Sequence, residues 1–189
     1  MFKKGFSLVE TILVLGFIAV SIGTTLYAYS SISQKSKVNS EIQAMTQLRD
    51  NIVSAYAIAD KLDFGTSQII EAGLVPDGLE VRSGRLYGKL SGYTVVGRAT
   101  AYNGAWSTGT YIRFYHRSIN AKDCIALAQK AMPVFDVVLI RSSSDRATNS
   151  SNAVTEIDGT THPDRIPELC NSISRPAVSM KTYMGINNR

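Results

Sequence analysis

The chain has 189 residues, a formal net charge of +5 and a sequence pI of 9.2. Two of its positive charges are Lys3 and Lys4, and the others are scattered without aromatic interleaving along one strand, so composition gives no support for a specific nucleic-acid partner. The length allows one membrane segment and one small domain with its own core, and no internal period of about 20 to 50 residues is visible.

The N-terminal sequence MFKKGFSLVE sets two lysines before Gly5 and one acid, Glu10, at the start of an apolar run. Residues 11–34 carry no charge and would form about 36 Å of helix, enough to cross a hydrocarbon core of about 30 Å. The lysines place the N-terminus in the cytoplasm by the positive-inside bias. Because the small residue precedes the apolar run, cleavage after Gly5 would keep the span, unlike cleavage of an ordinary signal peptide.

Glu10 is the unusual residue of this span, because a carboxylate at a bilayer centre costs from about 2.5 kcal/mol upward. We therefore expect it to have a partner. The order of basic residues, Gly5, Phe6, an acid and an apolar helix resembles the class III leader of type IV prepilins. That resemblance implies that a prepilin peptidase cleaves between Gly5 and Phe6 and methylates the Phe6 amine. It also implies that this amine, on an adjacent subunit, neutralises Glu10.

Gly16 and Gly23 lie within the span and each weakens an isolated helix by up to about 1 kcal/mol relative to alanine. One interpretation is close packing against neighbouring helices. The other is a stretch that melts locally when the subunit leaves the bilayer, which full hydrogen-exchange protection across residues 16–25 in a filament would exclude.

One helix is predicted to run from Phe6 to about Asp60, apolar all round at first and amphipathic later. The charged residues Lys37, Glu41, Arg49 and Asp50 are expected to fall largely away from the apolar stripe. The stripe itself recurs at three- and four-residue spacing and comprises Val38, Ile42, Met45, Leu48, Ile52, Val53 and Tyr56. This pattern predicts a spine for a domain to pack against, a continuity that a tethered enzyme does not need.

The remaining residues predict short helices and strands. A helix over 66–71, capped by Thr66 or Ser67, and a helix over 123–131, capped by Asn120 and stopped by Pro133, are expected. The predicted strands cover 85–90, 93–101, 110–116, 134–140 and 177–184, with a hairpin over 86–93. A solvent-facing loop is expected at 142–152 and a turn region at 158–163.

Cys124 and Cys170 are the only cysteines, and in an exported chain an isolated pair predicts a disulfide. It would close a loop of about 45 residues, worth about 4 kcal/mol by chain entropy; the alternative is two buried free thiols. A helix opening at Cys124, an apolar strand and a late Cys170 resemble the D-region of type IV pilins, here about residues 124–170. The length and the Glu71–Pro76 stretch resemble the type IVb branch, whereas the short leader resembles type IVa, and both remain open.

No catalytic residue, cofactor or metal is predicted. Ser142–Ser144 and Asp145 have no histidine in a triad motif, and His116 and His162 have no motif around them. Asp158, Asp164 and Glu168 do not have calcium-loop spacing, and no phosphate-binding glycine motif occurs.

The predicted fold is α+β, with a long N-terminal α-helical spine, transmembrane and then amphipathic, packed against an antiparallel β-sheet with a disulfide-bounded C-terminal region. Its expected parts are a leader (1–5), an assembly half of the helix (6–34), an amphipathic half (35–60) and a globular domain (61–189).

The resemblance implies a structural subunit, not an enzyme, that polymerises with itself into a surface filament for adhesion, aggregation or cell contact. Its implied partners are prepilin peptidase, the inner-membrane pilus assembly machinery and a host or recipient cell surface, and its location is the inner membrane and then the extracellular pilus. The alternatives are a minor pilin or type II secretion pseudopilin, and a membrane-anchored exported binding protein, which would need neither Glu10 nor a Gly5 cleavage site.

Overall fold

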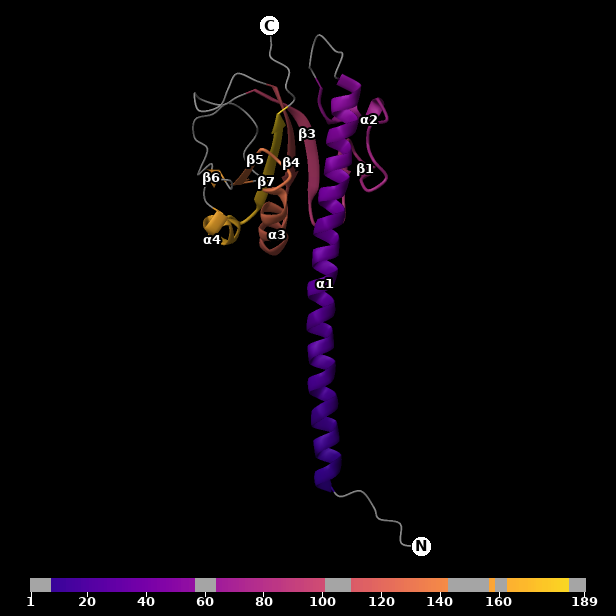
Figure 1. Ribbon diagram of the computed structural model, residues 1–189, viewed down its shortest axis with the longest axis vertical. Helices are drawn as coiled ribbons and strands as arrows, with labels where there is room; N and C mark the ends of the chain where they lie inside the picture. The colour runs from indigo at the N-terminus through magenta and orange to yellow at the C-terminus, as the bar shows by residue number, and fades with distance from the viewer. Residues whose placement is uncertain (1–7, 57–63, 101–109, 143–156, 159–162, 184–189) are drawn as a thin grey trace. The chain divides into compact units, whose positions relative to one another are not determined.

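The computed structural model of the chain describes residues 8–56, 64–100, 110–142, 157–158 and 163–183 (Figure 1). The chain divides into two compact units, Met1–Ser36 and Lys37–Arg189. Helix α1 (Leu8–Tyr56) has 49 residues and contributes to both units. The predicted long helix is thus confirmed over 8–56, while Phe6 and residues 57–60 lie outside the described residues.

The second unit contains short helices and one antiparallel sheet (Figure 1). Seven strands pair in the order β1-β2-β3-β4-β7-β5-β6, so the C-terminal strand lies inside the sheet between β4 and β5. The elements are α2 (Thr66–Glu71), β1 (Glu80–Arg82), β2 (Arg85–Tyr87), β3 (Tyr93–Thr100), β4 (Thr110–Arg117), α3 (Ala121–Ala131), β5 (Val137–Ser142), β6 (Ile157–Asp158), η1 (Pro163–Arg165), α4 (Ile166–Ser172) and β7 (Pro176–Tyr183).

The apolar stripe of α1 within the second unit forms part of a single core with the sheet, α3 and α4. Val38, Ile42, Met45, Leu48 and Ile52 are at most 6% exposed, and Val53 and Tyr56 pack partly buried against them, as the spacing predicts. The prediction for Glu41 is wrong, since this residue is only 1% exposed. Glu41 precedes Met45 by four residues and Leu48 by seven, so helical geometry puts it on the buried face whatever its charge.

The predicted disulfide is confirmed, and the free-thiol alternative is wrong. Cys124 in α3 and Cys170 in α4 are bonded, with Cα atoms 5.9 Å apart and a sequence separation of 46. Both cysteines are fully buried in the core. The bond fixes α4, a helix that the sequence analysis did not predict, against α3. The predicted fold class is therefore confirmed: a long N-terminal helix, an antiparallel sheet and a disulfide-bounded C-terminal region.

Several predicted boundaries move for local reasons. The strand expected over 85–90 ends at Tyr87, because the backbone N–H groups of Lys89 and Leu90 donate to the Glu41 carboxylate instead of a neighbouring strand. The strand expected from Val134 begins at Val137, because the N–H groups of Val134 and Phe135 both donate to the Ala131 carbonyl at the end of α3. In both cases backbone N–H groups of the predicted strand donate to a nearby acceptor, so these residues do not pair with a neighbouring strand.

The helix caps were predicted with mixed success. Asn120 caps α3 by accepting a hydrogen bond from the Asp123 N–H, at 2.8 Å, and the helix ends before Pro133, as expected. Thr66 and Ser67 do not cap α2, whose N-cap is Gly65. The Thr66 hydroxyl instead donates to the Val96 carbonyl and accepts from the Val96 N–H, so it joins α2 to β3.

Strand pairing also differs in detail from the predicted hairpin over 86–93. β2 and β3 are antiparallel neighbours, with Leu86 opposite Thr94. The tight hairpin lies earlier, between β1 and β2, where Ser83 and Gly84 both have positive φ, 47° and 70°. Two consecutive positive φ angles are typical of the two-residue turns that match strand twist.

Candidate functional site

The described residues of the first unit present an apolar helical surface that nothing in the described chain covers. Leu8–Thr25 is an 18-residue segment long and apolar enough to cross a membrane by length and composition, and none of it is buried. Leu8 and Phe17 are 77% and 76% exposed. The other large apolar side chains exposed in this segment are Val9, Ile12, Leu13, Val14, Leu15, Ile18, Val20 and Ile22.

The hydroxyl groups of Ser21, Thr24 and Thr25 are satisfied by the helix itself. Ser21 Oγ donates to the Phe17 carbonyl at 2.8 Å, and Thr25 Oγ1 donates to the Ser21 carbonyl at 2.8 Å. Thr24 Oγ1 is shared between the Val20 and Ser21 carbonyls. Hydroxyls bonded in this way carry little desolvation cost, so they do not prevent the segment from entering an apolar environment.

Gly16 and Gly23 leave open space on the helix surface, since a Cβ added at either would have no neighbour within 4 Å. Helix α1 continues through both positions. Small residues at an open helix surface let another helix approach closely in an apolar environment. The alternative of local melting remains a prediction.

Glu10 is the single charged residue between Leu8 and Lys35, and it lies exposed in the first described turn of α1. An acid at the N-terminal end of a helix is favoured by the helix dipole. No ion pair involves Glu10 among the residues that the structure describes. Gly5 and Phe6 lie outside those residues, so the cleavage site and the pairing of Glu10 with a Phe6 amine remain predictions.

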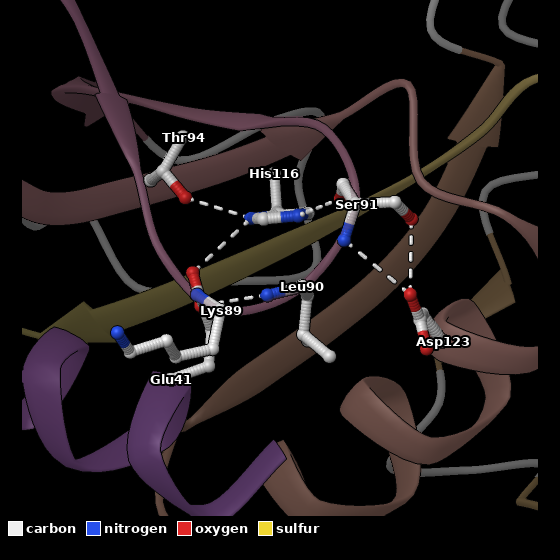
Figure 2. Close-up of polar contacts among 7 residues, drawn as sticks. All are labelled: Glu41, Lys89, Leu90, Ser91, Thr94, His116 and Asp123. Carbon is white, nitrogen blue, oxygen red and sulfur yellow. Dashed lines mark hydrogen bonds and ion pairs between the residues drawn. The ribbon is translucent and has the colours of Figure 1, made fainter. Parts of the chain in front are cut away.

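A second polar centre, which the sequence analysis missed, lies inside the second unit (Figure 2). We call Glu41, Ser91, Thr94, His116 and Asp123 the Glu41–His116 cluster. Glu41 and His116 have fully buried side chains, with Glu41 Oε1 3.6 Å from His116 Nδ1. Glu41 Oε2 accepts from the Lys89 N–H at 2.8 Å and from the Leu90 N–H at 3.4 Å. The carboxylate of α1 thus holds the connection between β2 and β3.

The cluster continues from the imidazole of His116 toward helix α3 (Figure 2). The Ser91 carbonyl is 2.8 Å from His116 Nε2, and Thr94 Oγ1 is 2.8 Å from Nδ1. Ser91 Oγ donates to Asp123 Oδ2 at 3.0 Å, and Asn120 Nδ2 donates to the same oxygen at 2.8 Å. Helix α1, the sheet and the start of α3 are therefore joined through one chain of polar contacts.

The surroundings of His116 determine its protonation. Because a carbonyl can only accept, Nε2 carries a proton and donates to Ser91, which leaves Nδ1 of the neutral ring to accept from the Thr94 hydroxyl. Burial lowers the pKa of His116 below its ordinary value, and the charges of Glu41 and Asp123 and the bond to Ser91 only partly oppose this effect. The imidazole is therefore neutral at pH 7.

The described residues contain no group of three or more His, Cys, Asp and Glu side chains that could hold a metal ion. Asp164 and Glu168 are exposed, and Arg165 Nε lies 3.8 Å from Glu168 Oε2. His162, Ser143, Ser144 and Asp145 lie outside the described residues.

Comparisons with known proteins give a likeness in structure. No protein-family model matches the chain, and no curated protein matches it. Among solved structures, the chain is similar to one described as "Crystal structure of type IV b pilin from Salmonella typhi". The two are 16% identical in sequence with a TM-score of 0.45, over 78% of this chain and 97% of that chain.

Proposed function

We propose that this protein is a structural subunit of a type IV pilus that polymerises through its N-terminal helix into a surface filament. The observation that carries the proposal is the segment Leu8–Thr25, which is apolar, unburied and charged only at Glu10. An apolar surface of this extent needs lipid or other protein to cover it. In the precursor a bilayer covers this surface, and in the filament the same helices of neighbouring copies cover it.

Glu10 distinguishes an assembly helix from a simple anchor. A membrane tether gains nothing from a carboxylate in its apolar segment, since that group costs about 2.5 kcal/mol or more at the bilayer centre. In a bundle of helices the same carboxylate can pair with the Phe6 amine of an adjacent copy once cleavage after Gly5 has created it. A buried ionic contact of this kind selects one register between helices, as single polar residues do in coiled coils.

The disulfide supports export of the second unit. Disulfides such as Cys124–Cys170 persist in oxidising compartments and are rare in the cytosol. With Lys3 and Lys4 holding the N-terminus in the cytoplasm, residues after the span would lie on the opposite side of the inner membrane. Prepilin peptidase and the inner-membrane assembly machinery would then act on the precursor, and the second unit would face host or recipient cells.

The test is intact-mass analysis of the sheared cell-surface fraction, before and after reduction. We expect an abundant chain that begins at Phe6, carries an increment of about 14 Da from N-methylation and gains about 2 Da on reduction. A processed chain found only in traces, or only in the inner membrane, would instead indicate a minor pilin or a secretion pseudopilin. An unprocessed chain that keeps Met1 would favour a membrane-anchored exported binding protein and contradict the proposal.

A further inference from the structure

The Glu41–His116 cluster buries an acid and a base that the assembly proposed above does not use. Glu41 is 1% exposed and His116 is fully buried, and their closest atoms are 3.6 Å apart. Glu41 Oε1 accepts no hydrogen bond within the described part of the chain. The carboxyl group of Glu41 lies directly beside an imidazole nitrogen, and its charge favours the protonated form of the ring.

The neutral state of His116 satisfies the ring fully, because Nε2 donates to the Ser91 carbonyl and Nδ1 accepts from Thr94. Protonation places a hydrogen on Nδ1, which can then no longer accept from the Thr94 hydroxyl. The new N–H would point toward Thr94 Oγ1 and Glu41 Oε1, and the ring would carry a charge in a site closed to water. The two protonation states therefore require different arrangements of the same contacts.

The charged groups around His116 come from two helices. Helix α1 contributes Glu41 and α3 contributes Asp123, and both favour the charged ring. The sheet neighbours in register with His116 are Thr94 of β3 and Val178 of β7, which carry no charge. Burial outweighs the two carboxylates, so protonation of the ring opposes the folded arrangement.

We propose that Glu41 and His116 act as a pH-sensitive clamp between helix α1 and the sheet, which holds while His116 is neutral and loosens when the ring takes up a proton. Loosening affects two connections at once, because the same Glu41 carboxylate also accepts from the Lys89 and Leu90 N–H groups. All residues of the clamp lie in the second unit, so the inference does not depend on filament assembly.

The sign of the pH dependence follows from linkage. In the unfolded chain a histidine titrates near its ordinary pKa of about 6.5, whereas burial lowers the pKa of His116 in the fold. Below about pH 6.5 the unfolded state therefore binds more protons, and stability falls as the pH falls. The unfolding equilibrium constant should rise by up to about tenfold per pH unit until the folded pKa is reached.

The experiment uses the full chain in detergent micelles, unfolded with denaturant between about pH 5 and pH 8. The chain has two histidines, so His162→Gln is the matched control for His116→Gln. We expect wild type and His162→Gln to lose stability on acidification and His116→Gln to show a flatter profile. A flat wild-type profile, or an equal slope in His116→Gln, would overturn the clamp.

Histidine-labelled NMR keeps the test decisive if His116→Gln fails to fold. In the wild-type protein we expect the His116 signal, assigned with the help of His162→Gln, to show a neutral ring with its proton on Nε2 at pH 7. Its protonation midpoint should lie below about 6.5, and a midpoint at or above that value would contradict the proposal. Glu41→Gln should move the midpoint to still lower pH, and an unchanged midpoint would remove Glu41 from the clamp.

Discussion

Helix α1 contains two stretches that differ in the burial of their apolar side chains. Between Leu8 and Thr25 none of its residues is buried, although most are apolar. Between Val38 and Ile52 its apolar residues lie in the core at 6% exposure or less. One helix thus has buried apolar side chains in one stretch and exposed apolar side chains in the other. The two stretches differ in whether the described chain buries their apolar side chains, although both stretches contain many such side chains.

The two stretches also differ in the surroundings of an acidic residue that lies among their apolar residues. Glu41 lies among apolar residues and finds its hydrogen-bond partners within the chain, in the Lys89 and Leu90 N–H groups. Glu10 lies among apolar residues and is exposed. By the same physical rule, a carboxylate in an apolar setting needs a partner, and that of Glu10 is expected on a second copy of the chain.

The largest expected effect comes from removing the intermolecular acid. Glu10→Ala should still enter the membrane, because the change makes the segment more apolar. Breaking a buried ion pair costs about 3–5 kcal/mol, so subunit incorporation into surface filaments should fall by more than about tenfold. The measurement is the amount of this subunit in sheared filaments relative to the membrane fraction.

Glu71→Ala is the matched control for that experiment, since Glu71 is an exposed acid at the end of α2. It should leave incorporation unchanged. Normal incorporation of the Glu10→Ala subunit would show that this acid needs no partner, and the contrast between Glu10 and Glu41 would then fail.

A change confined to the second unit should separate folding from membrane insertion. Replacing Cys124 and Cys170 with serine removes a cross-link with a sequence separation of 46, worth about 4 kcal/mol in the chain-entropy treatment. We expect the midpoint of denaturant unfolding to fall while the protein still fractionates with membranes. An unfolding midpoint equal to that of the oxidised wild type would show that burial of α3 and α4 alone holds this region.

Two leucine substitutions on the same helix compare the stretches directly. Leu48 is fully buried, so Leu48→Ala should cost about 2–5 kcal/mol of unfolding free energy. Leu13 is 69% exposed, so Leu13→Ala creates no cavity within the chain and should leave unfolding in detergent unchanged. Equal effects of the two substitutions would contradict the division of α1 by coverage.

Much of this architecture follows from periodicity and local chemistry. The apolar stripe from Val38 to Tyr56 predicts the packed helix, and Asn120 predicts the start of α3. The isolated pair Cys124 and Cys170 predicts the disulfide. These features succeed because spacing or a single residue type determines them, without knowledge of distant neighbours.

The Glu41–His116 cluster could not be predicted in the same way. Its members are brought together by strand register and by helix packing. A glutamate at position 41 also favours the prediction of a solvent-exposed side chain. Helical spacing alone places Glu41 on the same face as Met45 and Leu48, so its burial could be predicted. Its hydrogen-bond partners could not be predicted from that spacing. Strand order was equally hidden, since nothing local in β7 indicates that it lies between β4 and β5.

Gly88 gives the smallest and most specific test of the intramolecular acid. A Cβ on Gly88 would overlap the Glu41 carboxyl group, so Gly88→Ala must displace a side chain held by two backbone N–H groups. Leaving such buried donors unsatisfied costs about 1–3 kcal/mol, which denaturant unfolding would detect. Gly97→Ala is the control, because a Cβ there has no neighbour within 4 Å. If Glu41 only fills space, the two substitutions should differ in stability alone; if it pairs with His116, only Gly88→Ala should also change the protonation midpoint of that ring.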